Sequence, residues 1–355
     1  MAKEQTTQKK GKGKKSKTKT LLLILEVLLL VAAACILIVV MKFEKTNTRV
    51  NIDVDDLSIH PNVAKNETMK GYRNIALFGV DSTTGELEKK TRSDTIMIAS
   101  INEETKEVRL VSLYRDTFLN LGNDTYTKCN AAYQKGGPEQ AIQMLNTNLD
   151  LDIEDFVTVG FKGLKDVVDA LGGVEIEITQ GEISHLNNYQ YSMAEDMKIE
   201  YTPVKEPGVQ TLNGLQAVAY CRIRQIGNDF QRTERQRTVL TQISEKAKTM
   251  SVTQLNEIAT TAFEEVYTSL ELEEILSLIT EISEYEIIET TGFPQMNMLT
   301  TGNIGSHGSC VIPLDLASSV SWLHEFLFEE ENYEVSEQVQ SNSDEVTRRT
   351  SAYLQ

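Results

Sequence analysis

An apolar run at residues 21–41 constrains this chain more than any other feature of its sequence. As a helix, a run of this length would measure about 30 Å, close to the hydrocarbon thickness of a lipid bilayer. Eight lysines lie in residues 3–19, directly before the run, and lysines at one end of a membrane span mark its cytoplasmic side. We therefore predict a basic cytoplasmic tail at residues 1–20, a single transmembrane helix at residues 21–41, and the remainder outside the cell.

Three other interpretations of this segment stay open. A cleaved secretion signal has an apolar region of only about 7–15 residues followed by a small-residue site. The sequence Ala32-Ala-Ala-Cys35 resembles a lipoprotein cleavage site, although cleavage there would leave Cys35 followed by five apolar residues. A lysine-rich tail can also bind DNA, but the membrane span that follows explains the lysines without DNA.

The charge of the chain is unevenly distributed. Its formal net charge of -17 argues against nucleic acid as a partner, because binding to phosphate backbones needs a basic surface. Residues 249–347 contain 19 acidic residues and no lysine or arginine, whereas five of the 12 arginines lie within residues 222–237. This arginine-dense segment in an acidic chain indicates a local site for an anion.

The cysteines indicate neither a disulfide scaffold nor a metal centre. Cys129, Cys221 and Cys310 follow the apolar run, and no two of them have the spacing of metal ligands. One bridge between Cys129 and Cys221 stays open, while buried free thiols are the favoured interpretation.

Strand and helix patterns alternate after residue 72, which predicts an α/β fold. Short apolar or alternating runs predict strands at residues 74–81, 95–101, 107–113, 156–161 and 174–178, and one ending at Pro313. Apolar residues at helical spacing predict helices at residues 139–149, 162–171, 212–219 and 232–248, with at least two more in the acidic region. We predict an αβα sandwich around a mixed central β-sheet over residues 72–333.

The other segments lack a clear period. Residues 42–71 are polar and aperiodic, and we interpret them as a stalk between membrane and domain. Residues 180–208 are predicted to be mainly loop. Residues 334–355 are predicted to be a polar, disordered tail.

Two aspartates stand where predicted strands meet loops, Asp81 and Asp94. Carboxylates in such places suit Mg²⁺, which takes few protein oxygens besides water and substrate phosphate. Arginines suit phosphate, because the planar guanidinium donates two parallel hydrogen bonds. Acids and arginines together therefore suggest a pyrophosphate site with its metal. Taken singly, each has a plainer interpretation, an aspartate as a turn residue or helix cap and an arginine as part of a solvated face.

The chain resembles the LytR-CpsA-Psr family of cell-wall phosphotransferases in a series of short motifs. Each motif alone is weak evidence, but they follow one another in the family's order over residues 72–333. They are Gly79-Val-Asp81, Arg92-Ser-Asp-Thr95, Arg115-Asp-Thr117, Lys128-Cys-Asn-Ala-Ala-Tyr133 with Gly136-Gly137, Asp169-Ala-Leu-Gly-Gly-Val174, Leu212-Asn-Gly214, Tyr220-Cys-Arg-Ile-Arg224, and Asp229-Phe-Gln-Arg232 with Arg235-Gln236. The chain departs from the family pattern at four positions, with Tyr114 in place of the usual proline, Arg237 in place of a frequent glutamine, and cysteines at 129 and 221 where aliphatic residues are common.

The resemblance implies an enzyme of cell-wall assembly. It would transfer an anionic glycopolymer from an undecaprenyl-pyrophosphate carrier to peptidoglycan, forming a phosphodiester bond to the 6-hydroxyl of muramic acid. The polyprenyl tail would need an apolar groove, with walls expected from residues 139–149, 162–171 and 212–219. The alternative is a membrane-bound regulator or envelope-binding protein without catalytic activity.

The resemblance also implies roles for individual residues. Asp81 and Asp94 would hold Mg²⁺, or Mn²⁺, on the pyrophosphate. The catalytic residues would be Arg115, Arg222 and Arg224. Further substrate-binding residues would be Arg92, Lys128, Asp229, Arg232, Arg235 and Gln236.

Overall fold

The computed structural model describes residue 50 and residues 52–82, 87–88, 91–262 and 265–353. The predicted cytoplasmic tail and transmembrane helix, residues 1–20 and 21–41, lie outside the described residues. Within the described ranges, no helix is both long enough and apolar enough to cross a bilayer.

A six-stranded mixed sheet forms the centre of the structure, in the order β10-β3-β2-β1-β6-β9. β1 runs antiparallel to β2 and parallel to β6, so the prediction of a mixed sheet is confirmed. The strands predicted at residues 74–81, 95–101, 107–113 and 156–161 all belong to it. The six strands are β1 (Tyr72–Val80), β2 (Ser93–Asn102), β3 (Glu107–Leu113), β6 (Asp155–Gly160), β9 (Val266–Thr268) and β10 (Glu286–Phe293).

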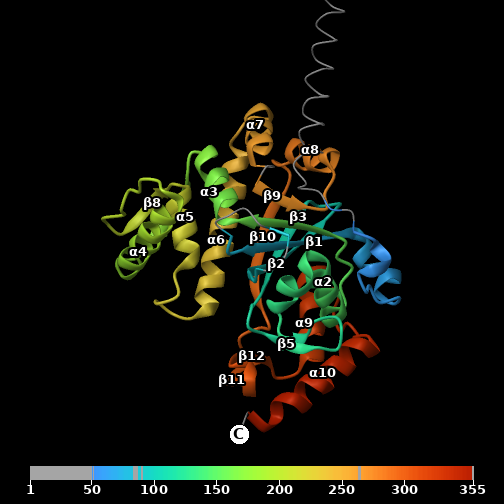
Figure 1. Ribbon diagram of the computed structural model, residues 1–355. Helices are drawn as coiled ribbons and strands as arrows, with labels where there is room; N and C mark the ends of the chain where they lie inside the picture. Colours follow the sequence, from blue (N-terminus) through green and yellow to red (C-terminus); the bar gives the residue numbers. More distant parts are fainter. Residues whose placement is uncertain (1–49, 51, 83–86, 89–90, 263–264, 354–355) are drawn as a thin grey trace, which may run out of the picture. The chain divides into compact units, whose positions relative to one another are not determined.

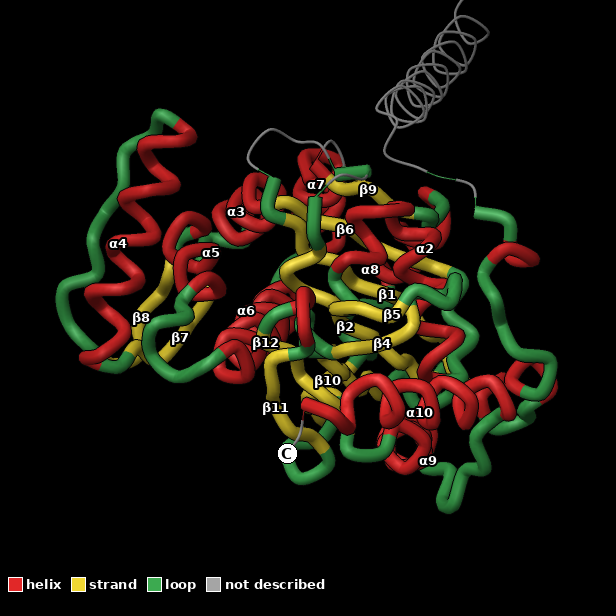
Figure 2. Tube along the Cα trace, turned by 60° about the horizontal axis from the view of Figure 1, so that its bottom comes forward, coloured by secondary structure: helices red, strands yellow, loops and turns green. Residues whose placement is uncertain are grey.

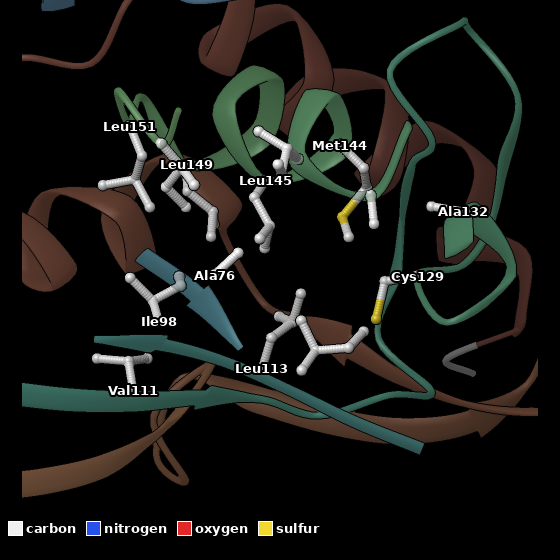
Figure 3. Packing of buried hydrophobic residues seen from close by; sticks show 14 of the residues in the cluster. Ala76, Ile98, Val111, Leu113, Cys129, Ala132, Met144, Leu145, Leu149 and Leu151 are labelled. Carbon is white, nitrogen blue, oxygen red and sulfur yellow. The ribbon is translucent and has the colours of Figure 1, made fainter. Parts of the chain in front are cut away.

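One face of the sheet packs against α2 (Ala131–Leu149) and α9 (Leu316–Phe328). Successive side chains of a strand point to opposite faces, and Ala76 and Phe78 of β1 belong to this core. Figure 3 shows Met144 and Leu145 of α2 directed toward the sheet, where Ala76 and Leu113 lie. The largest hydrophobic core of the protein is on this side.

The other face of the sheet is covered by α3 (Phe161–Ala170), α5 (Gly214–Arg222) and α6 (Asp229–Lys248), so helices flank the sheet on both sides (Figures 1 and 2). Leu77 of β1 points to this face, and Leu240 of α6 packs there against Ala99 and Leu110. Two glycines follow the end of α3. Gly172 and Gly173 have φ of +80° and +94°, a left-handed conformation that costs glycine little.

Residues 180–208 are not mainly loop, and this prediction is wrong. They contain α4 (Gln180–Met197), whose first turn is closed by reciprocal hydrogen bonds between Thr179 and Glu182, a capping box. The buried side of α4 includes the polar Gln190 beside Leu186 and Met193, which weakens the helical pattern of the sequence. The strand predicted at residues 174–178 forms, but it is β7 (Val174–Ile178), which pairs only with β8 (Gly208–Leu212) outside the central sheet.

The described part of the predicted stalk, which begins at Val50, is instead part of the domain. It forms three short 3-10 helices at Val54–Asp56, Val63–Lys65 and Met69–Gly71. Leu57, Val63 and Met69 are fully buried in the main core. Because these anchors are six residues apart, they produce neither helical nor strand periodicity in the sequence.

The carboxy-terminal segment is also ordered, contrary to the predicted disordered tail. It forms α10 (Glu337–Thr350), which packs against α9 and α2. Ser336 caps the helix by accepting a hydrogen bond from the Val339 amide. Only Val339 and Val346 among its buried residues are apolar, the others being Asn342, Ser343 and Thr350, so composition alone conceals the buried face. The remaining strands and α-helices of the described chain are β4 (Phe118–Asn120), β5 (Tyr126–Lys128), α7 (Val252–Ala262), α8 (Leu272–Thr280), β11 (Leu299–Asn303) and β12 (Ser309–Pro313).

We expect Asn342→Ala to lower the free energy of unfolding by about 2 kcal/mol, because buried hydrogen-bonding groups would lose their partners. The Asn342 side-chain oxygen accepts from Tyr126 Oη at 2.9 Å and from Asn120 Nδ2 at 3.1 Å. Urea denaturation of this variant and of Gln340→Ala, an exposed position on the same helix, would measure the difference. Equal stability of the two variants would contradict an integral role for α10.

Candidate active site

Strand pairing brings Asp81 and Asp94 to one end of the central sheet. β1 and β2 are antiparallel, and Val80 lies opposite Ser93. Asp81 directly follows Val80, and Asp94 directly follows Ser93. Both aspartates line the same cavity, so the two candidate metal ligands lie in one site, as the sequence predicted.

Three arginines surround Asp94. Arg115 Nη1 lies 2.6 Å from its Oδ1 and Arg224 Nη2 lies 2.8 Å from its Oδ2. Arg232 Nη1 is 3.7 Å from the same Oδ2, and its Nη2 donates to the Asp94 carbonyl at 3.0 Å. Burial of Asp94 acts to raise its pKa, but the arginines outweigh burial and hold the pKa below its usual value. Asp94 therefore stays ionised and fixes the three guanidinium groups around itself.

Asp229, at the start of α6, completes this network. Its Oδ1 lies 3.2 Å from Arg232 Nη2 and 3.5 Å from Arg115 Nε. Arg232 is almost fully buried, and burial lowers its pKa to about 10 although Asp229 opposes the shift. Such a buried cation needs its carboxylate partners, because an unpaired buried charge is strongly destabilising.

Arg222 is held in a different way, between two aromatic rings. Its guanidinium carbon lies 4.5 Å from the ring centre of Phe161 and 5.3 Å from that of Tyr189. Its nearest carboxylate oxygen, Asp81 Oδ2, is 4.0 Å away. Within the described part of the chain Arg222 donates no hydrogen bond. Its donors are therefore available to a ligand, while cation–π contacts hold the guanidinium in place.

An apolar cavity of about 330 Å³ extends from these charged residues between the sheet and the helices. Its polar end contains Asp81, Asp94, Arg222, Arg224, Arg232 and Gln236. Its apolar wall is formed by Leu77, Met97, Val157, Val159, Leu164, Val218, Val239, Leu240 and Ile243, among others. Such a cavity suits a ligand with an anionic head and a hydrocarbon tail.

The walls of this cavity agree only in part with those expected from the sequence. α3 and α5, which cover residues 162–171 and 212–219, contribute Leu164 and Val218 as expected. Residues 139–149 do not, because α2 packs in the core on the opposite face of the sheet. α6 supplies the third wall instead, with Val239, Leu240 and Ile243.

Five predicted site residues do not line the cavity. Arg115 and Asp229 belong to the ion-pair network around Asp94 but lie behind the cavity wall. Arg235 pairs with the buried Glu182 at 2.8 Å and donates to the carbonyl oxygens of Ile223 and Ile226. It thus holds the segment that carries Arg224. Arg92 is exposed and donates to Gln134 Oε1 at 3.2 Å.

Lys128 belongs to an outer layer of charge around the site. Its Nζ lies 3.2 Å from Asp116 Oδ1, and Asp116 Oδ2 lies 3.9 Å from Arg115 Nε. Asp116 follows Arg115 in the Arg-Asp-Thr motif, so its position next to the site could have been predicted from the sequence. Phe161, Tyr189 and Glu182 also contact arginines of the predicted site, but they lie in other elements and belong to none of the motifs. The sequence alone could not identify them as site residues.

All three cysteines of the described chain are free and buried, so the structure contains no Cys129–Cys221 bridge. Cys221 lines the apolar cavity, and burial raises its pKa to about 12. The thiols are therefore packing residues in their protonated form.

Asp81 and Asp94, the candidate ligands of the predicted metal ion, are the two carboxylates at the polar end of the cavity. Among the described residues no group of three or more His, Cys, Asp or Glu side chains could hold a metal on its own. Asp81 and Asp94 offer two carboxylates, and each Asp94 oxygen keeps a lone pair after accepting one close arginine hydrogen bond. This set suits Mg²⁺, which completes its shell with water and substrate oxygens.

Known proteins resemble this chain in sequence and in fold. A model of the LytR_cpsA_psr family matches residues 38–309. The polyisoprenyl-teichoic acid–peptidoglycan teichoic acid transferase TagV of Bacillus subtilis is 30% identical over 213 residues, which are 58% of this chain and 51% of that protein. The chain thus spans about half the length of this relative.

A second relative and a solved structure extend the comparison. The transferase TagU of Enterococcus faecalis is 30% identical over 233 residues, which are 62% of this chain and 71% of that protein. A solved structure of TagT with bound octaprenyl pyrophosphate lipid has a TM-score of 0.53 and 22% identity, covering 74% of this chain and 92% of that one. This likeness shows the mixed α/β fold.

Proposed function

Because the chain belongs to the LytR_cpsA_psr family, we propose that it transfers an anionic glycopolymer from an undecaprenyl-pyrophosphate carrier to peptidoglycan. One observation carries the proposal, namely that an arginine cluster stands at the polar end of an apolar cavity. A polyprenyl pyrophosphate has this same division into a charged head and a hydrocarbon tail. The names of the two relatives and the lipid in the TagT structure support this choice of substrate.

The arginines account for the chemistry of transfer. The 6-hydroxyl oxygen of muramic acid attacks the phosphorus next to the glycan and loses its proton, and the bond from that phosphorus to the bridging oxygen breaks. The glycopolymer becomes attached through a phosphodiester bond, and the carrier leaves as polyprenyl phosphate. Phosphoryl transfer depends mainly on positioning and charge stabilisation. Arg115, Arg222, Arg224 and Arg232 supply both, because Asp94, Asp229 and two aromatic rings hold them in place.

Asp81 and Asp94 would hold a Mg²⁺ or Mn²⁺ ion in this account. When bound, the ion would neutralise negative charge on the pyrophosphate oxygens. Gln236 lines the cavity, and its buried Oε1 lacks a hydrogen-bond partner among the described residues. The side-chain nitrogen of Gln236 would donate a hydrogen bond to an oxygen of the substrate head group.

The proposed location is the outer face of the cell membrane, with the amino terminus in the cytoplasm. The apolar run at residues 21–41 and the lysines before it support this single-pass topology. A carrier that stays in the bilayer also requires an enzyme beside the bilayer.

A reconstituted reaction with purified full-length protein, lipid-linked glycopolymer and peptidoglycan tests the proposed function. The expected products are polymer linked to muramic acid and free polyprenyl phosphate. A protein that bound the lipid but formed no link would contradict it.

We expect Ile243→Asp to weaken the binding of octaprenyl pyrophosphate by about tenfold or more, because a carboxylate in the apolar cavity would have to be desolvated by the lipid tail. Inorganic pyrophosphate should bind unchanged, since Ile243 lies in the apolar part of the cavity, away from the arginines. Lys246→Asp, at an exposed position of the same helix, is the matched control. Equal lipid affinity of Ile243→Asp and the control would show that the tail lies elsewhere.

A further inference from the structure

A second group of side chains adjoins the arginine cluster on the other flank of α6. Arg232 and Val239 of this helix line the cavity. Phe230 lies two positions before Arg232, and Arg237 lies two positions before Val239. Two positions correspond to a rotation of about 200° around the helix axis. Phe230 and Arg237 therefore lie on a common flank of α6, turned away from the apolar cavity.

Tyr114 packs against α6 on this flank, and Met296 contacts Tyr114. The Tyr114 ring packs edge-on against Phe230, with ring centres 4.4 Å apart, and its hydroxyl contacts Met296 Sδ at 3.8 Å. Met296 is 56% exposed and Phe230 is partly exposed. Because Tyr114 directly precedes Arg115 and Phe230 directly follows Asp229, this apolar surface borders the arginine cluster.

Arg237 is the unexplained member of the group. Its Nε and Nη1 atoms are buried, and neither has a hydrogen-bond partner in the described structure. Tyr114 and Glu234 are the groups that favour its charge, yet neither forms an ion pair or hydrogen bond with it among the described residues. Burial lowers the pKa of Arg237. A desolvated guanidinium without a partner is unfavourable, and an anion bound to the remaining nitrogen of Arg237, Nη2, would stabilise its charge.

We propose that Arg237, with Phe230 and Met296, binds the acceptor strand of peptidoglycan by a carboxylate of its peptide. This inference rests on the proposed transfer reaction and identifies where its second substrate lies. In phosphoryl transfer the attacking and leaving oxygens are roughly in line. The leaving polyprenyl phosphate belongs to the apolar cavity, so the acceptor oxygen approaches the phosphorus from the side away from that cavity, where the surface of Tyr114 and Phe230 borders the arginine cluster. There Nη2 of Arg237 can donate a charge-assisted hydrogen bond to a carboxylate, and Phe230 and Met296 can pack against the apolar face of a sugar.

The test compares two soluble peptidoglycan fragments, disaccharide peptides with free or with amidated carboxylates, titrated into the full-length protein by calorimetry. We expect the wild-type protein to bind the free-acid fragment about tenfold more tightly, the size expected for a charge-assisted hydrogen bond. Arg237→Gln should remove this difference and leave octaprenyl pyrophosphate affinity unchanged. The variant removes a partly buried charge that has no hydrogen-bond partner among the described residues, so it should fold normally. Arg348→Gln, an exposed arginine on α10, should keep the difference.

Two results would overturn the inference. One is unchanged discrimination between the fragments in Arg237→Gln, and the other is an equal loss of octaprenyl pyrophosphate affinity, which would place Arg237 in the donor site. The titration needs no turnover. The wild-type protein could transfer no polymer while Arg237→Gln still lost the preference for the free-acid fragment. That result would contradict the proposed transfer reaction but support the proposed binding site.

Discussion

Asp94→Asn is expected to reduce transfer by at least about 10³-fold and to lower the free energy of unfolding by about 3 kcal/mol. The carboxylate of Asp94 holds Arg115 and Arg224 in close ion pairs and lies near the buried Arg232. A neutral amide cannot balance three guanidinium groups, so they would repel one another and leave their positions. The expected loss of stability is at the lower end of the range for breaking a buried ion pair, because the Asp94 side chain keeps 21% of its surface exposed.

The same residue predicts a dependence of stability on pH. The pKa of Asp94 is depressed in the folded protein, so its stabilising contribution is fully present above the unfolded-state pKa of about 3.9. The contribution is lost as the pH falls through the lower folded-state pKa. Asp94→Asn should therefore show a weaker fall in stability with acidification than the wild-type protein.

Urea denaturation at neutral pH and at acid pH, together with transfer rates, would measure these effects. Asp55→Asn, at an exposed position, is the control for the chemical change. A free energy of unfolding equal to that of the control, with transfer within about twofold of it, would show that Asp94 does not organise the arginines.

The second large effect is expected for Arg222→Ala, with transfer lowered by about 10²- to 10³-fold but stability nearly unchanged. In the described structure Arg222 donates no hydrogen bond, and its closest carboxylate oxygen is 4.0 Å away. Its removal therefore leaves no close ion-pair partner behind, and what is lost is charge stabilisation of the leaving phosphate. Arg222→Lys should restore little activity, because an ammonium lacks the planar pair of donors.

Arg349→Ala provides a matched control, since Arg349 also lies over an aromatic ring, that of Tyr126 at 4.4 Å, but on α10. Thermal unfolding and transfer rates would be measured for each variant. Full activity of Arg222→Ala would show that Arg222 does not contribute to transfer. A large loss of stability in this variant would show that Arg222 has a structural role.

The sequence predicted the parts of the fold whose patterns are local. Strands such as 107–113 and helices such as 232–248 combine unbroken periodicity with clear ends, and they were found within a few residues of their predicted bounds. α4 and α10 were missed because each buries polar side chains, such as Gln190 and Asn342, that weaken an apolar stripe. The buried residues of 52–71 were missed because single anchors such as Leu57 have no period.

The same limit applies to the site. The motifs identified Asp81, Asp94 and the arginines as candidate site residues. The pairing of β1 with β2 and the position of α6 bring most of these side chains together. Sequence spacing could not separate Arg235, which pairs with Glu182, from Arg232, which reaches Asp94. The difference depends on where α4 packs, and no motif encodes that position.

The most direct test of the central claim is to measure the covalent product formed by purified full-length protein from lipid-linked glycopolymer and peptidoglycan. Mass spectrometry of the digested wall material should show polymer joined by a phosphodiester bond to the muramic-acid 6-hydroxyl, with one polyprenyl phosphate released per link. Arg222→Ala should form at least about 100-fold less of this product at equal protein concentration. Absence of the link with the wild-type protein, or equal product from Arg222→Ala, would contradict a transferase that works through this arginine cluster and favour a regulatory or envelope-binding role.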